Sequence, residues 1–173
     1  MLLIEAPLGS GKTTALLRFC ADAGEHILIR LQHVPPNPPK IWDSIIASLG
    51  DRYPDVAVFL RALGYPDDEM RLALLENYLR ERHRSQPLFI VFDDYPALSL
   101  PSMDRLLESL AHTKMFHVIV SGEDLSYLPA DLWVEEGLAR WMPAAAFLFS
   151  STDVYEYFQQ AGTAITETRA NTI

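Results

Sequence analysis

A glycine-rich stretch near the start of the chain constrains the fold more than any other feature. Residues 6–14 read APLGSGKTT, which fits the pattern Ala/Gly-x-x-x-x-Gly-Lys-Ser/Thr of a phosphate-binding loop. The apolar run LLIEA at residues 2–6 precedes it, and an amphipathic pattern over residues 12–23 follows it. A buried strand, the loop and a helix in this order predict an α/β protein with a largely parallel sheet.

Each residue type in this loop serves the binding of phosphate. Glycines at positions 9 and 11 let backbone N–H groups approach phosphate oxygens without an intervening Cβ. Lys12 supplies a positive charge to the β- and γ-phosphates, and the Thr13 hydroxyl is placed to reach Mg²⁺. The alternative is a glycine-rich turn with no ligand. The residues expected to hold the nucleotide are Pro7, Leu8, Gly9, Ser10, Gly11, Lys12, Thr13 and Thr14.

A second motif supplies the acidic partner that a phosphate-binding loop requires. Residues 88–94 read LFIVFDD, an apolar run that ends in two carboxylates. A carboxylate at the carboxyl end of a central strand lies where open α/β sheets bind ligands. We therefore expect Asp93 to hold Mg²⁺ together with Thr13, and Asp94 to polarise the attacking water. Asp94 is alternatively a carboxylate that caps the loop.

The remaining periodicity predicts a P-loop NTPase three-layer sandwich with a mostly parallel central sheet of about five strands. Further strands are expected at residues 26–31, 87–95, 116–122 and 146–150, and further helices at 41–49, 54–63, 67–84, 101–112 and 151–160. The helix at 67–84 is expected to face the core through Met70, Leu74, Leu75, Tyr78 and Leu79. Residues 1–150 form the expected nucleotide-binding domain. Residues 151–173 are either the start of a helical module or a frayed tail.

Composition narrows the classes of partner. The chain has 173 residues, 23 acidic against 14 basic, and a formal net charge of −9. This balance argues against direct binding to nucleic acid or to an anionic membrane through a basic face. The single cysteine, Cys20, excludes an internal disulfide framework. No apolar run approaches the roughly 20 residues that span a bilayer, so the expected location is the cytoplasm.

At the two motifs the sequence resembles the STAND ATPases. IEAPLGSGKTTALLRF and LFIVFDDYPAL look like the nucleotide-binding domain of the maltose-regulon activator and of the large LuxR-type regulators. The resemblance implies a signalling switch that binds ATP or ADP with Mg²⁺, hydrolyses ATP slowly, and controls transcription. It also implies self-association or partner domains within a larger regulator.

Three departures from that family affect these expectations. The fourth strand ends in VSGED, with Gly122 where the family usually has an arginine that senses the terminal phosphate. The chain starts at the first strand, without the family's segment that helps to enclose adenine. The DNA-binding and inducer-sensing modules are absent, so the chain is either a fragment or a protein that works with a partner. If residues 151–160 are the first helix of the missing module, their apolar face of Val154, Tyr155 and Phe158 would lack its normal cover and favour association.

Two other functions remain open at this stage. One is a non-catalytic interaction module that retains the P-loop fold. The other is a small-molecule kinase, which would need arginines in a lid over the transferred phosphoryl group. Residues 114–150 offer only Lys114 and Arg140 for such a lid, which disfavours the kinase.

Overall fold

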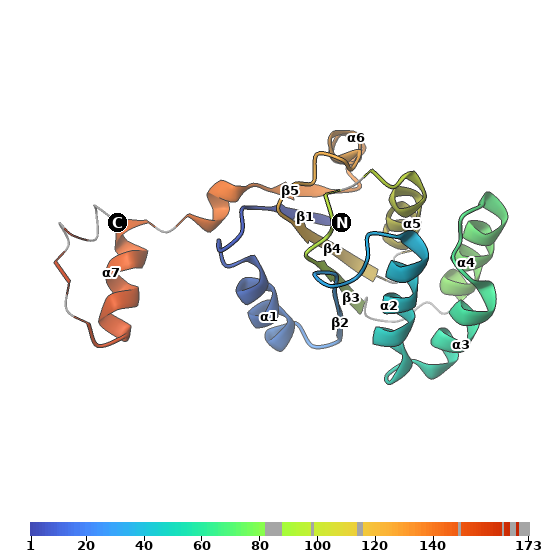
Figure 1. Cartoon of the computed structure of the whole chain (residues 1–173), viewed down its shortest axis with the longest axis horizontal. Helices are drawn as coiled ribbons and strands as arrows, with labels where there is room; N and C mark the ends of the chain where they lie inside the picture. The colour runs from blue at the N-terminus through green and yellow to red at the C-terminus, as the bar shows by residue number, and fades with distance from the viewer. Residues whose placement is uncertain are drawn as a thin grey trace.

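The computed structural model describes residues 1–81, 88–97, 99–113, 116–148, 150–163, 165–166 and 169. Its centre is a parallel five-stranded sheet in the order β2-β3-β4-β1-β5 (Figure 1). The strands are β1 (Leu2–Glu5), β2 (His26–Arg30), β3 (Leu88–Asp93), β4 (Phe116–Gly122) and β5 (Arg140–Met142). The helices are α1 (Lys12–Asp22), α2 (Pro38–Gly50), α3 (Pro54–Leu63), α4 (Glu69–Glu81), α5 (Pro101–His112), α6 (Ala130–Glu135) and α7 (Ser151–Gln160), with a 3₁₀ turn, η1 (Ala144–Phe147).

The strand order determines which loops meet. β1 lies between β4 and β5, and β4 lies between β1 and β3. All of these pairs are parallel, so the carboxyl ends of the strands share one edge of the sheet. The glycine-rich loop after β1, the two aspartates at the end of β3 and the end of β4 therefore meet at that edge.

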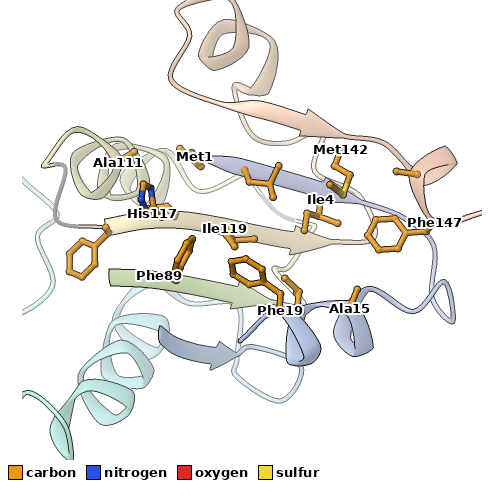
Figure 2. Close-up of a pocket in the computed structure, with 15 residues that line it drawn as sticks. Met1, Ile4, Ala15, Phe19, Phe89, Ala111, His117, Ile119, Met142 and Phe147 are labelled. Atoms are coloured by element: carbon orange, nitrogen blue, oxygen red, sulfur yellow. The ribbon is translucent and has the colours of Figure 1, made fainter. Parts of the chain in front are cut away.

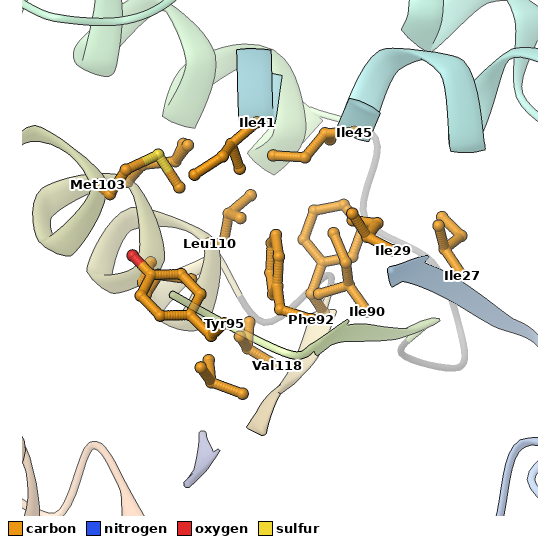
Figure 3. Packing of buried hydrophobic residues seen from close by; sticks show 14 of the residues in the cluster. Ile27, Ile29, Ile41, Ile45, Ile90, Phe92, Tyr95, Met103, Leu110 and Val118 are labelled. Carbon is orange, nitrogen blue, oxygen red and sulfur yellow. The ribbon is translucent and has the colours of Figure 1, made fainter. Parts of the chain in front are cut away.

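Most of the apolar core lies on one face of the sheet, beneath helices α2 to α6. Leu3 of β1 points into this core, as do the even-numbered residues of β3 and β4. Figure 3 shows the packing between the sheet and helices α2 and α5. Its labelled members are Ile27, Ile29, Ile41, Ile45, Ile90, Phe92, Tyr95, Met103, Leu110 and Val118.

The opposite face carries a much smaller core beneath α1. It consists of Ile4, Leu16, Cys20, Val91 and Ile119. α1 covers part of this face, and α7 stands apart from the sheet (Figure 1). The prediction of a parallel α/β sandwich is confirmed, and its two layers of helices are very unequal in size.

The fifth strand is not where the sequence placed it. The strand predicted at residues 146–150 is wrong, because the 3₁₀ turn η1 occupies Ala144–Phe147, and Phe149 lies outside the described residues. The fifth strand is instead Arg140–Met142, which pairs with β1 at the edge of the sheet. A three-residue edge strand that begins with an arginine has no apolar run to reveal it, and Pro143 then ends the pairing.

The predicted inward face of the α4 helix is also partly wrong. Met70 and Leu74 are 69% and 50% exposed, whereas Leu72, Leu75 and Leu79 are buried. Several apolar side chains compete for the interior on this helix, and packing against α3 and α5 selects the face that contains Leu72. The helix ends at Glu81, and the predicted extension over residues 82–84 lies outside the described residues.

Candidate functional site

The loop between β1 and α1 has the backbone of an anion cradle. Gly9 and Gly11 have φ values of 81° and 90°, in the left-handed region that favours glycine. Gly11 is the N-cap of α1, provides no capping side chain, and precedes a first turn without an acidic residue. The helix begins with the Ala15 N–H donating to Gly11 O at 2.9 Å. The first-turn N–H groups of α1 thus have no side-chain acceptor, which is the arrangement that suits a bound phosphate.

Lys12 is folded back over this loop. Its side chain is 5% exposed, and its Nζ donates to Ala6 O at 2.5 Å and to Pro7 O at 3.0 Å. Among the described residues, no carboxylate lies within ion-pair distance of this ammonium. A buried cation held only by two carbonyl oxygens keeps its full charge available to an anionic ligand.

Asp93 lies at the carboxyl end of β3, on the α1 face of the sheet. Val91 belongs to the α1-side core, and Asp93 follows it at the alternate position of the strand. Asp93 is 1% exposed, and its Oδ1 makes no hydrogen bond to the described residues. A buried carboxylate oxygen without a donor is costly, and a cation ligand relieves that cost.

Ser121 repeats this pattern on the neighbouring strand. It follows Ile119 by two positions in β4, so it also faces α1. It is fully buried, and its Oγ has no hydrogen-bond partner among the described residues. Two orphaned oxygens on adjacent strands therefore point toward the side on which the Lys12 loop lies.

Backbone hydrogen bonds hold the three loops together. The Ala6 N–H donates to Gly122 O at 3.3 Å, and the Tyr95 N–H donates to Ser121 O at 2.8 Å. β1 and β3 are separated by one strand, so their ends lie about 10 Å apart.

Asp94 lies in a different environment from its neighbour. Its backbone is left-handed, with φ at 56°, and its side chain is half-buried. Burial raises the pKa of its carboxyl, and the charge of Asp93 raises it further; Lys12 acts in the opposite direction. A carboxylate with raised proton affinity suits proton transfer from water, and that role for Asp94 stays a prediction.

A cleft of about 360 Å³ opens beside Asp94 at the same edge of the sheet. Leu8 of the phosphate loop and Gln32 after β2 form part of its wall, and Glu123 contributes a second carboxylate. The cleft therefore carries two carboxylates beside the phosphate loop.

Position 122 is crowded in the structure, which gives a steric reason why a glycine stands there in place of the arginine that is usual in the STAND ATPases. A Cβ at this position would lie 2.6 Å from Leu125 Cδ2 and 3.1 Å from Tyr95 O. Both distances are below ordinary van der Waals contact. A side chain at position 122 would therefore require Leu125 to move and Tyr95 O to shift by a few tenths of an ångström.

Sequence reasoning missed two residues at the site. Arg30 ends β2 in register with Asp93, is exposed, and acts to lower the pKa of Asp94. Glu5 accepts the Leu125 N–H at 2.9 Å and so fixes the loop after β4 to the strand that carries the phosphate loop. Arg30 could have been predicted, because it is a charged residue at the end of an apolar strand. No local sequence pattern indicates a role for Glu5.

The other predicted nucleotide-binding residues form the loop itself and the first turn of α1. Pro7, Leu8, Gly9 and Thr14 are exposed, and Ser10 and Thr13 are half-buried. Of the two residues weighed for a kinase lid, Arg140 pairs with Leu2 at the opposite edge of the sheet, and Lys114 lies outside the described residues. No cluster of three or more metal-ligating side chains occurs in the described part of the chain. None of its helices is long and apolar enough to cross a membrane.

Comparison with known proteins identifies the fold. No protein-family model and no curated protein matches the chain. Among solved structures, it is similar to the Walker-type ATPase PABY2304 of Pyrococcus abyssi, with a TM-score of 0.54 and 13% identity over 99% of this chain. It is also similar to a chain in the structure of Drosophila ORC bound to AT-rich DNA and Cdc6, with a TM-score of 0.53 and 12% identity over 97% of this chain.

These likenesses show a P-loop ATPase-like fold. The chain covers 56% and 58% of the length of the two matched chains, so it corresponds to a part of each.

Proposed function

We propose that this chain is a nucleotide-binding switch domain of the STAND type that binds ATP or ADP with Mg²⁺ and turns ATP over slowly or not at all. The observation that carries the proposal is the pairing of a buried, carboxylate-free Lys12 with the orphaned Asp93 oxygen at one edge of the sheet. Neither group has a partner of opposite charge among the described residues, and a Mg²⁺–nucleotide complex provides one for each. Its role in a transcriptional regulator rests on the sequence resemblance.

The residues present fit a magnesium ion. Mg²⁺ in nucleotide sites is held by one or two protein oxygens together with phosphate oxygens and water. Thr13 and Asp93 are the protein ligands that we propose, since the Thr13 hydroxyl follows Lys12 and Asp93 Oδ1 is buried without a donor. When bound, the ion would neutralise phosphate charge and orient the terminal phosphate.

Slow turnover follows from the charges around the cleft. Stabilising the transferring phosphoryl group requires cations near its equatorial oxygens. Glu123 and Asp94 line the cleft, and an arginine at position 122 would require Leu125 and Tyr95 O to shift. Lys12 and the metal ion would supply the positive charge, so binding is supported more strongly than hydrolysis.

Titration calorimetry with ATP and ADP, with Mg²⁺ and with EDTA, tests the proposal on the wild-type chain and on Lys12→Ala. Loss of a charge-assisted contact costs about 1.5–3 kcal/mol, so the Kd should rise about 10–100-fold. Arg18→Ala is the matched control, because Arg18 is an exposed cation on the same helix and should leave the Kd unchanged. Asp93→Asn should abolish the difference between Mg²⁺ and EDTA.

Phosphate release, measured on the same samples, separates the alternatives. Binding with little release supports the switch. Absence of binding at millimolar nucleotide would overturn the proposal and leave the non-catalytic interaction module. Rapid release would contradict the reasoning from Gly122 and Glu123.

A further inference from the structure

An apolar groove lies open on the α1 face of the sheet. Its volume is about 890 Å³. β1, β3 and β4 form the floor, α1 forms one wall, and η1 forms the other (Figure 2). Its lining includes Leu2, Ile4, Phe19, Ile119, Met142 and Phe147. In a three-layer sandwich, helices normally cover both faces of a parallel sheet. Of the helices that the structure describes, α1 alone packs on this face.

α7 is an amphipathic helix with an uncovered apolar face. Val154, Tyr155 and Phe158 share one side of the helix, and no residue of α7 is buried. The helix starts with a complete capping box, in which the Ser150 hydroxyl accepts the Asp153 N–H and the Asp153 carboxylate accepts the Ser150 N–H. The cap favours helix formation without tertiary contacts.

The connection from the groove to α7 leads away from the sheet. Phe147 lines the groove, and α7 begins only four residues later. Leu148 and Ser150 both have extended backbone, with ψ at 128° and 161°. α7 is consequently held out beside the body of the protein (Figure 1). A short connection favours exchange of an element between two copies over folding back within one.

Size and charge match the helix to the groove. α7 has ten residues and is about 15 Å long, and the four residues of β4 that line the groove, 116–119, extend about 13 Å. α7 carries Asp153 and Glu156 and no basic residue. Arg140 lies on the groove side of β5, because it shares a face with Met142.

We propose that α7 of one copy of this chain occupies the groove of a second copy, so that two chains exchange α7 reciprocally and form a dimer. The exchange covers both apolar surfaces and places the acidic helix beside Arg140. It adds a helix to the α1 side of the sheet in each copy.

Light scattering after size-exclusion chromatography tests the assembly. The wild-type chain should have twice the mass of one chain at micromolar concentration. Phe158→Asp places a charge on the docking face, and the dimer Kd should rise about tenfold or more. Gln160→Asp adds the same charge on the opposite side of α7 and should leave the dimer intact. A wild-type monomer, or equal effects of the two substitutions, would overturn the proposal.

Disulfide trapping tests which copy supplies the helix. In a Cys20→Ala background, Ala111→Cys at one end of the groove is paired with Ser151→Cys or Ala161→Cys at either end of α7. Oxidation should give a covalent dimer on a non-reducing gel with one of the two pairs, and single-cysteine chains are the controls. An intrachain disulfide would show that α7 folds onto its own groove, and this result would overturn the exchange, as would the absence of any cross-link.

Discussion

Gly122→Ala tests whether the loop after β4 is packed as tightly as the structure indicates. The added Cβ would lie 2.6 Å from Leu125 Cδ2, 3.4 Å from Leu125 Cγ and 3.1 Å from Tyr95 O. The leucine terminus can rotate away, whereas the carbonyl belongs to the backbone and cannot. Overpacking of this kind costs about 1–3 kcal/mol, and the loss of glycine's freedom in the unfolded chain returns about 0.4–1 kcal/mol. We expect a net destabilisation of about 1–2 kcal/mol.

Urea unfolding at fixed protein concentration measures this change. The midpoint should fall with an unchanged m-value, and the Tm should fall by about 2–8 °C for a chain of this size. Gly50→Ala is the matched control, because Gly50 ends α2 and its nearest neighbour to a new Cβ is Arg61 Nη2 at 3.9 Å. The control should be neutral or stabilising by up to about 1 kcal/mol.

A double-mutant cycle assigns the cost to Leu125. Leu125→Ala alone should cost about 2–5 kcal/mol, since this side chain is 1% exposed. Combined with Gly122→Ala, the loss should be about 1 kcal/mol smaller than the sum, because the shortened side chain has no Cδ2 to clash with the new Cβ. If Gly122→Ala proves as stable as Gly50→Ala, the steric explanation for the missing arginine is refuted.

Two further predictions concern stability. Burial, with Glu108 nearby, raises the pKa of Asp104 to about 6, and its Oδ1 has no hydrogen-bond partner among the described residues. In the unfolded chain this carboxyl loses its proton at a lower pH than in the folded protein, so Asp104 lowers the stability as pH rises from about 4 to 6. Asp104→Asn should therefore be more stable than the wild type near pH 7.5 and equally stable near pH 4. Measurement of Tm at both pH values checks this prediction. Leu75→Ala should cost about 2–5 kcal/mol and Leu74→Ala less than about 1 kcal/mol in urea unfolding, because Leu75 is 1% and Leu74 is 50% exposed; equal costs would contradict the orientation of α4.

Much of the site could be predicted from the sequence because its signals are local. The glycines and Lys12 occur within one short segment, and the apolar run that ends at Asp93 identifies a buried strand without reference to the rest of the chain. In the structure Gly9 and Gly11 are left-handed and Asp93 is buried, and ligand binding by these residues stays a prediction.

The errors fell where local pattern and packing disagree. β5 is three residues long and half-exposed, so its sequence has no pattern that distinguishes a strand from a loop. Only its pairing with β1 in the folded protein identifies it as a strand. On α4, apolar residues occur on more than one side, and only the neighbouring helices select the buried set. Arg30 and Glu5 join the site through strand order and cross-strand contact, which no spacing in the sequence encodes.

The sequence by itself determined the phosphate loop, the acidic end of β3 and the parallel α/β class, because each depends on contiguous residues and on periodicity. Only the tertiary structure decided that a Cβ at position 122 would crowd Leu125 and Tyr95 O, that oxygens of Ser121 and Asp93 have no hydrogen-bond partner among the described residues, and that a groove remains open beside α1. These features arise where segments distant in the chain meet, and the distances between such segments are set by packing.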